Sequence, residues 1–146
     1  VEINLNKRIP VAAGMAGGSS NCAAALKGMN QLFDLGLSID ELCEIGVTLG
    51  ADVPYCVLGG TAIARGIGEV LTPLPAPADC HVIIAKPPVS VSTAYVYGHI
   101  KPLKITKRPD IEAMAQSIKD GDLKKMASLI YNVMEDIMPD LSCILI

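Results

Sequence analysis

The amino-acid sequence predicts an α+β fold. Segments in which apolar and polar residues alternate, as in strands, are mixed with segments whose apolar residues recur every three or four positions, as in helices. Two of the strand-like segments flank a short glycine turn, which indicates a hairpin. The steady strand–helix alternation of a parallel α/β sheet is not present. The mixture therefore favours α+β.

The N-terminal elements follow from periodicity and capping residues. Ile3 and Leu5 alternate with polar residues, which predicts a strand over Glu2–Arg8. A loop rich in Gly and Ala comes next, and a helix is expected from about Ser19 to Phe33. The residues expected on the apolar face of that helix are Cys22, Leu26, Met29 and Phe33.

A second helix is expected after Ser38, which forms a capping box with Glu41. This helix should end near Gly50. Its expected apolar stripe consists of Leu42, Ile45 and Leu49.

The second half begins with the predicted hairpin. Its strands are Thr61–Arg65 and Glu69–Leu74, around the turn Gly66-Ile67-Gly68. Prolines 73, 75 and 77 then predict a linker, so we expect one partial domain over residues 1–75 and another over residues 76–146. Beyond the linker the sequence predicts a buried strand and three helices, at His81–Lys86, Ser92–His99, Asp110–Lys119 and Asp122–Ile130.

Composition narrows the class of protein. The 146 residues carry a formal net charge of −3, with four Tyr, one Phe and no Trp, whereas nucleic-acid binders usually show a basic face and stacking aromatic residues. No apolar run has the length of a membrane span, and no leader sequence opens the chain. The five cysteines are far apart and odd in number, which argues against a zinc site or a disulfide framework. We expect reduced thiols in a cytoplasmic protein.

The strongest chemical signal is the glycine-rich loop between the first strand and the first helix. Glycine lets the backbone approach a ligand closely, and a helix N-terminus presents free N–H groups and a positive dipole end to an anion. The loop has neither the Walker pattern nor the dinucleotide pattern. Its other interpretation is a turn that only starts a helix. The candidate phosphate-binding residues are Pro10, Val11, Ala12, Ala13, Gly14, Met15, Ala16, Gly17, Gly18, Ser19 and Ser20.

The second signal is Asp52, which lies among small and apolar residues in Leu49–Pro54. A carboxylate in such surroundings is expected to be partly desolvated, as suits a general base or an electrostatic partner. The other interpretation is that Asp52 caps the next turn, which Pro54 favours.

The pattern Pro-x-x-x-Gly-Met-Ala-Gly-Gly-Ser-Ser-Asn resembles the phosphate-binding motif of the GHMP kinases, although the family's loop is often richer in glycine. The Gly-Gly-Ser-Ser-Asn ending and the Gly-Ala-Asp-Val-Pro segment are most similar to members whose substrate is 4-diphosphocytidyl-2-C-methyl-D-erythritol. The resemblance implies that the loop holds ATP, that Mg²⁺ neutralises the phosphates and that Asp52 is catalytic. It implies substrate contacts for Lys7, Thr93 and Tyr97. From the residues alone, Lys7 is equally a solvated strand lysine and Tyr97 an ordinary packing residue.

The implied activity is transfer of the γ-phosphoryl group of ATP to the 2-hydroxyl of that cytidine-bearing substrate, in non-mevalonate isoprenoid biosynthesis. Another GHMP small-molecule kinase and a non-catalytic nucleotide-binding module are the alternatives. No nucleic-acid or membrane partner is expected, no residue is assigned as a metal ligand, and the oligomeric state is left open. The resemblance places a catalytic lysine before Val1 and a third motif after Ile146. We therefore expect an internal piece of the enzyme, with little activity by itself.

Overall fold

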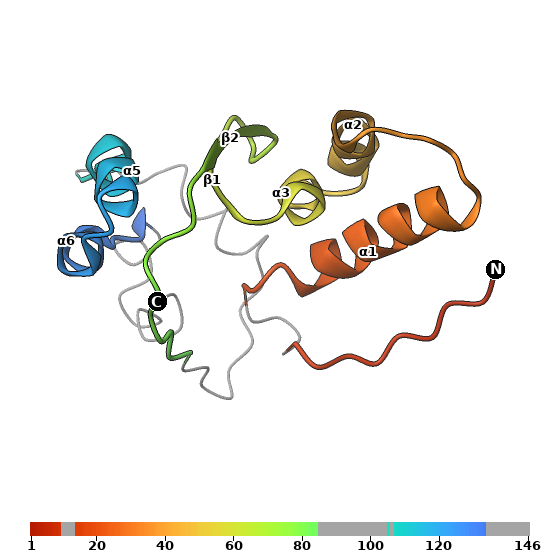
Figure 1. The fold of residues 1–146 in the computed structure, drawn as a ribbon, viewed down its shortest axis with the longest axis horizontal. Helices are drawn as coiled ribbons and strands as arrows, with labels where there is room; N and C mark the ends of the chain where they lie inside the picture. Colours follow the sequence, from red (N-terminus) through yellow and green to blue (C-terminus); the bar gives the residue numbers. More distant parts are fainter. Residues whose placement is uncertain (10–13, 85–104, 106, 134–146) are drawn as a thin grey trace.

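The structure is a computed structural model and describes residues 1–9, 14–84, 105 and 107–133. Within these residues it contains helices and one two-stranded antiparallel sheet, so the predicted α+β class is confirmed. Figure 1 shows three helices, α1 to α3, on one side of the sheet and two, α5 and α6, on the other.

Helices α1 (Gly17–Leu32), α2 (Ile39–Leu49) and α3 (Val53–Leu58) enclose the core of the N-terminal part. The buried side chains of this core are Ala23, Leu42, Val53 and Val57. Gly46 of α2 lies directly against Val53, since a Cβ placed on Gly46 would stand 2.8 Å from Val53 Cγ1. The sequence prediction missed α3, which is short and has proline in its first turn.

Side-chain hydrogen bonds fix the start of α2, and a glycine follows its last residue. The predicted capping box is confirmed: Glu41 N–H donates to Ser38 Oγ (3.2 Å), and Ser38 N–H donates to Glu41 Oε2 (2.8 Å). The loop before it is attached to α1 through Asn30, whose amide exchanges two hydrogen bonds with the backbone of Leu37 (2.9 and 3.0 Å). The helix ends at Leu49 with Gly50 as its C-cap, as predicted.

The hairpin lies between the two groups of helices (Figure 1). Strand β1 (Thr61–Arg65) pairs with β2 (Val70–Leu74), with Arg65 opposite Val70 beside the turn. This confirms the predicted hairpin, with β2 beginning one residue later than expected.

Two more predicted helices are confirmed on the other side of the hairpin. Helix α5 (Ile111–Lys119) is capped by Asp110, and α6 (Leu123–Leu129) by Asp122. Helix α5 contacts β2, and Arg65 of β1 pairs with Glu112 of α5 at 3.1 Å.

Two predicted strands are wrong in the described residues. Glu2–Arg8 and residues 81–84 have no ladder partner there, and Ile3, Val82 and Ile83 are exposed. A strand needs a neighbouring backbone to satisfy its N–H and C=O groups, and alternating apolar residues do not supply one. Residues 85 and 86, and the predicted helix Ser92–His99, lie outside the described residues.

The predicted apolar stripes are only partly buried. Leu42 is in the core, but Ile45 and Leu49 of the same stripe are 40% and 61% exposed. In α1, Cys22 and Leu26 pack against the core, whereas Phe33 is 52% exposed. The described part of α1 and α2 therefore turns a narrower face inward than the periodicity predicts.

The described cysteines are free thiols, as predicted. Cys22, Cys43 and Cys56 are partly buried against the core, and Cys80 is exposed. Burial raises the pKa of the Cys43 and Cys56 thiols, since it disfavours the thiolate. Cys143 lies outside the described residues.

Candidate active site

The glycine-rich loop leads directly into α1. Gly14 and Ala16 have positive φ angles of 66° and 46°, and Ala16 is the N-cap residue of the helix. A left-handed conformation costs an alanine about 1 kcal/mol, because its Cβ approaches the next carbonyl oxygen. Strain of this kind tends to persist at functional sites, which favours a ligand-binding loop over a simple turn.

The N-terminus of α1 is open to an anion. The N-cap residue makes no side-chain hydrogen bond to the first turn, and that turn holds no acidic residue. A Cβ placed on Gly14 or Gly18 would meet nothing within 4 Å, so space remains beside the backbone. The Ser20 hydroxyl donates to the Gly17 carbonyl (3.1 Å). The first N–H groups can thus donate hydrogen bonds to a phosphate at the positive end of the helix dipole.

Lys7 lies beside this helix terminus. A Cβ placed on Gly17 would stand 3.1 Å from Lys7 Nζ and 3.2 Å from Ile9 Cγ2. The absence of a side chain at Gly17 therefore allows the ammonium group to approach the start of α1. A cation there adds to the positive field of the helix dipole.

Asp52 occupies the N-cap position of α3, but its side chain makes no capping hydrogen bond. The capping interpretation of Asp52 is therefore not supported. Its backbone is held on both sides, because Val53 N–H donates to the Gly50 carbonyl (3.0 Å) and Cys56 N–H donates to the Asp52 carbonyl (3.2 Å).

The expected partial desolvation of Asp52 is wrong, since the residue is exposed. The buried residues of this segment are instead its apolar neighbours Val53 and Pro54. The Asp52 charge still reaches the Cys56 thiol: burial raises the pKa of Cys56 first, and the Asp52 charge raises it further.

Three segments far apart in the sequence meet at this point. The Ser19 Oγ lies 3.9 Å from where a Cβ on Gly50 would be. A Cβ on Gly68 would stand 3.2 Å from the Ala51 carbonyl oxygen and 3.9 Å from Asp52 Oδ1. The start of α1 and the hairpin turn thus each lie beside the segment before α3. A helix terminus that can bind phosphate, close to a segment that carries a carboxylate, is an arrangement suited to phosphoryl transfer. The sequence analysis gave Gly50 only as a helix end and Gly68 only as part of the hairpin turn, and assigned neither to the site.

Comparison with known proteins agrees with this geometry. Residues 1–60 match the GHMP kinases N terminal domain. The chain is 57% identical over 135 residues to the 4-diphosphocytidyl-2-C-methyl-D-erythritol kinase of Lachnoclostridium phytofermentans, covering 92% of this chain and 46% of that protein.

Over residues 1–60 the chain is thus similar to the GHMP kinases.

Other members are similar in sequence and structure. The 4-diphosphocytidyl-2-C-methyl-D-erythritol kinase of Geobacillus kaustophilus is 50% identical over 137 residues, covering 94% of this chain and 47% of that protein. A crystal structure of 4-(cytidine 5'-diphospho)-2C-methyl-D-erythritol kinase is 30% identical, with a TM-score of 0.63 over 92% of this chain and 47% of that one. The chain thus spans about half the length of the relatives it matches.

Several predicted site residues of the chain lie outside the described residues. These are Pro10, Val11, Ala12 and Ala13 of the loop, together with Thr93 and Tyr97. Among the described ones, Lys7 lies beside Gly17, and Ser19 lies beside Gly50, two residues before Asp52.

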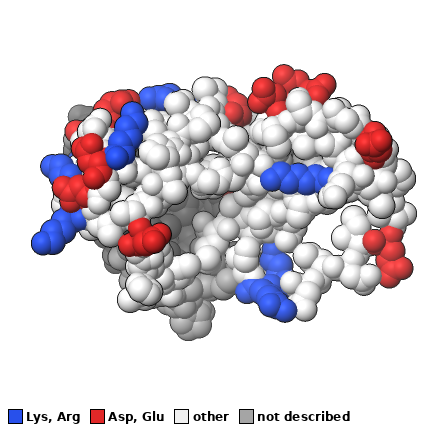
Figure 2. Space-filling model, in the orientation of Figure 1, with Lys and Arg blue, Asp and Glu red and all other residues white. Residues whose placement is uncertain are grey.

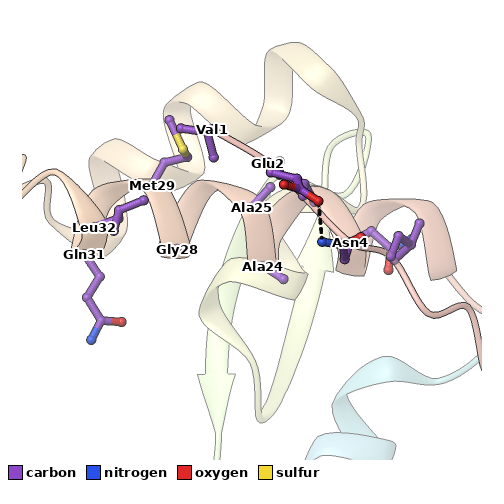
Figure 3. Close-up of a pocket in the computed structure, with 12 residues that line it drawn as sticks. Val1, Glu2, Asn4, Ala24, Ala25, Gly28, Met29, Gln31 and Leu32 are labelled. Carbon is purple, nitrogen blue, oxygen red and sulfur yellow. Dashed lines mark hydrogen bonds between the residues drawn. The ribbon is translucent and has the colours of Figure 1, made fainter.

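A separate groove of about 840 Å³ lies between residues 1–5 and α1 (Figure 3). Its walls are mainly apolar, with Ala24, Ala25 and Met29 on the helix side. Asp52 and the described loop residues 14–20 are not among the described residues that line it. The groove follows from the way the extended N-terminal segment lies along α1, and it is distinct from the candidate active site.

The surface of the chain carries both charges. Figure 2 shows Lys and Arg interspersed with Asp and Glu around a hollow near the centre of the visible face.

Among the residues that the structure describes, no helix is both long and apolar enough to cross a membrane. Among those same residues, no three His, Cys, Asp or Glu side chains are grouped so that they could hold a metal ion.

Proposed function

We propose that this chain forms the phosphate-binding and acid–base part of a kinase. The proposed reaction is transfer of the γ-phosphoryl group of ATP to the 2-hydroxyl of 4-diphosphocytidyl-2-C-methyl-D-erythritol, in the non-mevalonate route to isoprenoids. The names of the relatives support the substrate, and the meeting of the start of α1 with the Asp52 segment supports the reaction type.

The proposed phosphate site is the loop Pro10–Ser20 with the first turn of α1. The residues present fit an anionic group, because the helix terminus has no side-chain cap and no acidic residue in its first turn. Backbone N–H groups would hold the phosphate oxygens. The Lys7 ammonium, beside Gly17, would add positive charge on the same side.

ATP in such enzymes is used with Mg²⁺, which usually keeps several waters and binds phosphates with only one or two protein groups. The proposed ion would therefore be held mainly by the phosphate oxygens. The Ser19 hydroxyl, whose oxygen lies 3.9 Å from where a Cβ on Gly50 would be, could help to hold it.

Asp52 is proposed to orient the 2-hydroxyl and to accept its proton. The hydroxyl oxygen then forms the new bond to the γ-phosphorus while the bond from that phosphorus to the bridging oxygen breaks, which releases ADP. Positioning and charge stabilisation supply most of the catalysis in such a transfer. An exposed carboxylate on a fixed backbone, as at Asp52, can meet a substrate arriving from solvent.

The remaining proposed substrate contacts are Thr93 and Tyr97, with Tyr97 stacking on the cytosine ring and Lys7 contributing from the loop side. We further propose a boundary between a nucleotide-binding domain, residues 1–75, and a substrate domain, residues 76–146. The coil that follows β2 at Leu74 supports this boundary.

The test is Asp52→Asn in the full-length enzyme. The variant keeps the shape of the side chain and removes its charge. We expect kcat to fall by about 10²–10⁴-fold, the usual contribution of a positioned acid–base group, with the KM for the cytidine substrate within twofold. Asp79→Asn removes an exposed carboxylate elsewhere and should leave kcat unchanged. A kcat for Asp52→Asn within a few fold of wild type would show that Asp52 is not the acid–base group.

The alternative functions give different results in the same assays. ATP binding without phosphorylation of any hydroxyl substrate would indicate a nucleotide-binding module. Phosphorylation of another small alcohol in preference to the cytidine substrate would indicate a different member of the GHMP kinases.

A further inference from the structure

The turn of the β1–β2 hairpin lies against the segment that carries Asp52. A Cβ placed on Gly68 would stand 3.2 Å from the Ala51 carbonyl oxygen, which is closer than most Cβ contacts in proteins. The same Cβ would stand 3.9 Å from Asp52 Oδ1. The backbone of the turn at Gly68 therefore lies beside the Ala51 carbonyl, and a side chain on Gly68 would also reach the Asp52 carboxylate.

Gly68 also has a backbone conformation that side chains rarely adopt, with φ at 121°. Such a residue is placed by the structure around it. Gly68 N–H donates to the Arg65 carbonyl (3.1 Å), which closes the turn on β1. The Glu69 carboxylate accepts a hydrogen bond from the Ile67 N–H (2.7 Å), which fixes the backbone in the middle of the turn.

The rest of the hairpin holds this turn in place from two directions. The strands are paired up to Arg65 and Val70, directly beside the turn. On the side away from α1–α3 (Figure 1), Arg65 pairs with Glu112 of α5 at 3.1 Å. The turn thus belongs to a hydrogen-bonded element that contacts α5, and its tip meets the Asp52 segment.

We propose that the Gly66–Glu69 turn is a positioning element for Asp52 and that Gly68 is its positioning residue. This inference rests on the proposed function, in which Asp52 is the acid–base group. The Asp52 side chain makes no capping hydrogen bond, so in this proposal its position depends on the backbone of Ala51, which the turn adjoins. The backbone around Asp52 is hydrogen-bonded at Gly50 and Cys56. A displacement of the Ala51 carbonyl would therefore be passed on to the carboxylate.

Gly68→Ala in the full-length enzyme tests the proposal. The added methyl group forces the Ala51 carbonyl away by a few tenths of an ångström. A misplacement of about 1 Å can cost on the order of 10²-fold in rate, so we expect kcat to fall by about tenfold. Both KM values should stay within twofold, because the atoms that the added methyl group would meet belong to Ala51 and Asp52.

The matched control is Gly60→Ala. Gly60 also has a positive φ, 69°, but a Cβ there would meet nothing within 4 Å. Both substitutions strain the backbone near the hairpin, and only one reaches Asp52. Gly60→Ala is expected to keep kcat within twofold of wild type. Equal losses of kcat in the two variants would overturn the proposal.

A double-mutant cycle with Asp52→Asn separates positioning from general damage. If Gly68 acts through Asp52, the tenfold effect of Gly68→Ala is absent in the Asp52→Asn background. The same fold-loss in both backgrounds overturns the positioning role and leaves the proposed function intact. Wild-type kcat in Asp52→Asn itself overturns both the acid–base assignment and the positioning role.

A second variant and a spectroscopic readout cover the case in which Gly68→Ala does not fold. Glu69→Ala removes the acceptor of the Ile67 N–H and adds no atom against Ala51, and it should lower kcat with the same dependence on Asp52. The carboxyl ¹³C signal of Asp52 should shift in Glu69→Ala and Gly68→Ala, and should not shift in Gly60→Ala. An unchanged Asp52 signal in the folded turn variants would overturn the proposal.

Discussion

Gly46 is the position where the packing of α2 against α3 is most sensitive to one added methyl group. It is buried in α2, and a Cβ there would stand 2.8 Å from Val53 Cγ1 and 3.4 Å from Val53 Cβ. Val53 is only 2% exposed and has Val57, fully buried, in the same core. It therefore has no free space into which to move, and Gly46→Ala must push α3 away from α2.

The size of the effect follows from two opposed contributions. Alanine is favoured over glycine inside a helix by about 1 kcal/mol. Overpacking of a well-packed core costs about 1–3 kcal/mol, and a contact of 2.8 Å that involves a branched, buried side chain belongs at the upper end. Gly46→Ala should therefore lower the free energy of unfolding by about 1–2 kcal/mol.

Gly28→Ala is the matched control, because Gly28 is also inside a helix but a Cβ there would meet nothing within 4 Å. This variant should raise the free energy of unfolding by about 0.5–1 kcal/mol. The assay is equilibrium urea unfolding of the full-length protein, followed by the midpoint and slope of the transition.

A third variant identifies Val53 as the source of the clash. In Gly46→Ala, the further change Val53→Ala removes the methyl groups that the new Cβ meets, so the double variant should be more stable than the sum of the single effects by about 1 kcal/mol. An increase in stability for Gly46→Ala, as for Gly28→Ala, would refute the packing argument, as would simple additivity in the double variant.

Two further predictions concern titrating groups. The hydrogen bonds from Ser38, first from its backbone and then from its side chain, lower the pKa of Glu41 from its usual value of 4.5. A carboxylate whose pKa is lowered in the folded state stabilises the protein above the unfolded pKa, and this stabilisation is lost as the pH falls through the folded pKa. Wild type should therefore be more stable than Glu41→Gln at pH 7. Unfolding curves that keep this difference at pH 3 would contradict the assignment. Burial raises the pKa of Cys43 and of Cys56, so both thiols should react with iodoacetamide at pH 7 more slowly than exposed Cys80. Mass spectrometry of a time course measures the three rates. Equal rates at the three sites would argue against this packing.

The local features of the chain could be predicted from the sequence, because each depends on residues only a few positions apart. The capping box of Ser38 and Glu41 needs only one turn of helix, and Asp110 and Asp122 cap their helices in the same way. The glycine turn of the hairpin also follows from neighbouring residues. The family motif around the start of α1 is equally local, so the loop and its helix were predicted together.

Whether a segment outside the hairpin forms a strand could not be predicted in the same way. Residues 2–8 and 81–84 have the alternation of strands but no partner in the described part of the chain, and a ladder depends on which backbone lies alongside. The exposure of Ile45 and Leu49 has a similar cause: periodicity defines a face of α2, whereas the extent to which that face is covered depends on where α1 and α3 pack.

The arrangement of the candidate site was decided by the tertiary structure. Asp52 was identified from its sequence motif, but its exposure depends on the burial of its neighbours Val53 and Pro54 in α3. The approach of Ser19 to Gly50, and of Gly68 to Ala51 and Asp52, joins segments that the sequence separates. Glycine at these positions has no side chain whose chemistry could indicate a role. Its role comes from the backbone that packs against it, and only the folded chain brings that backbone into contact.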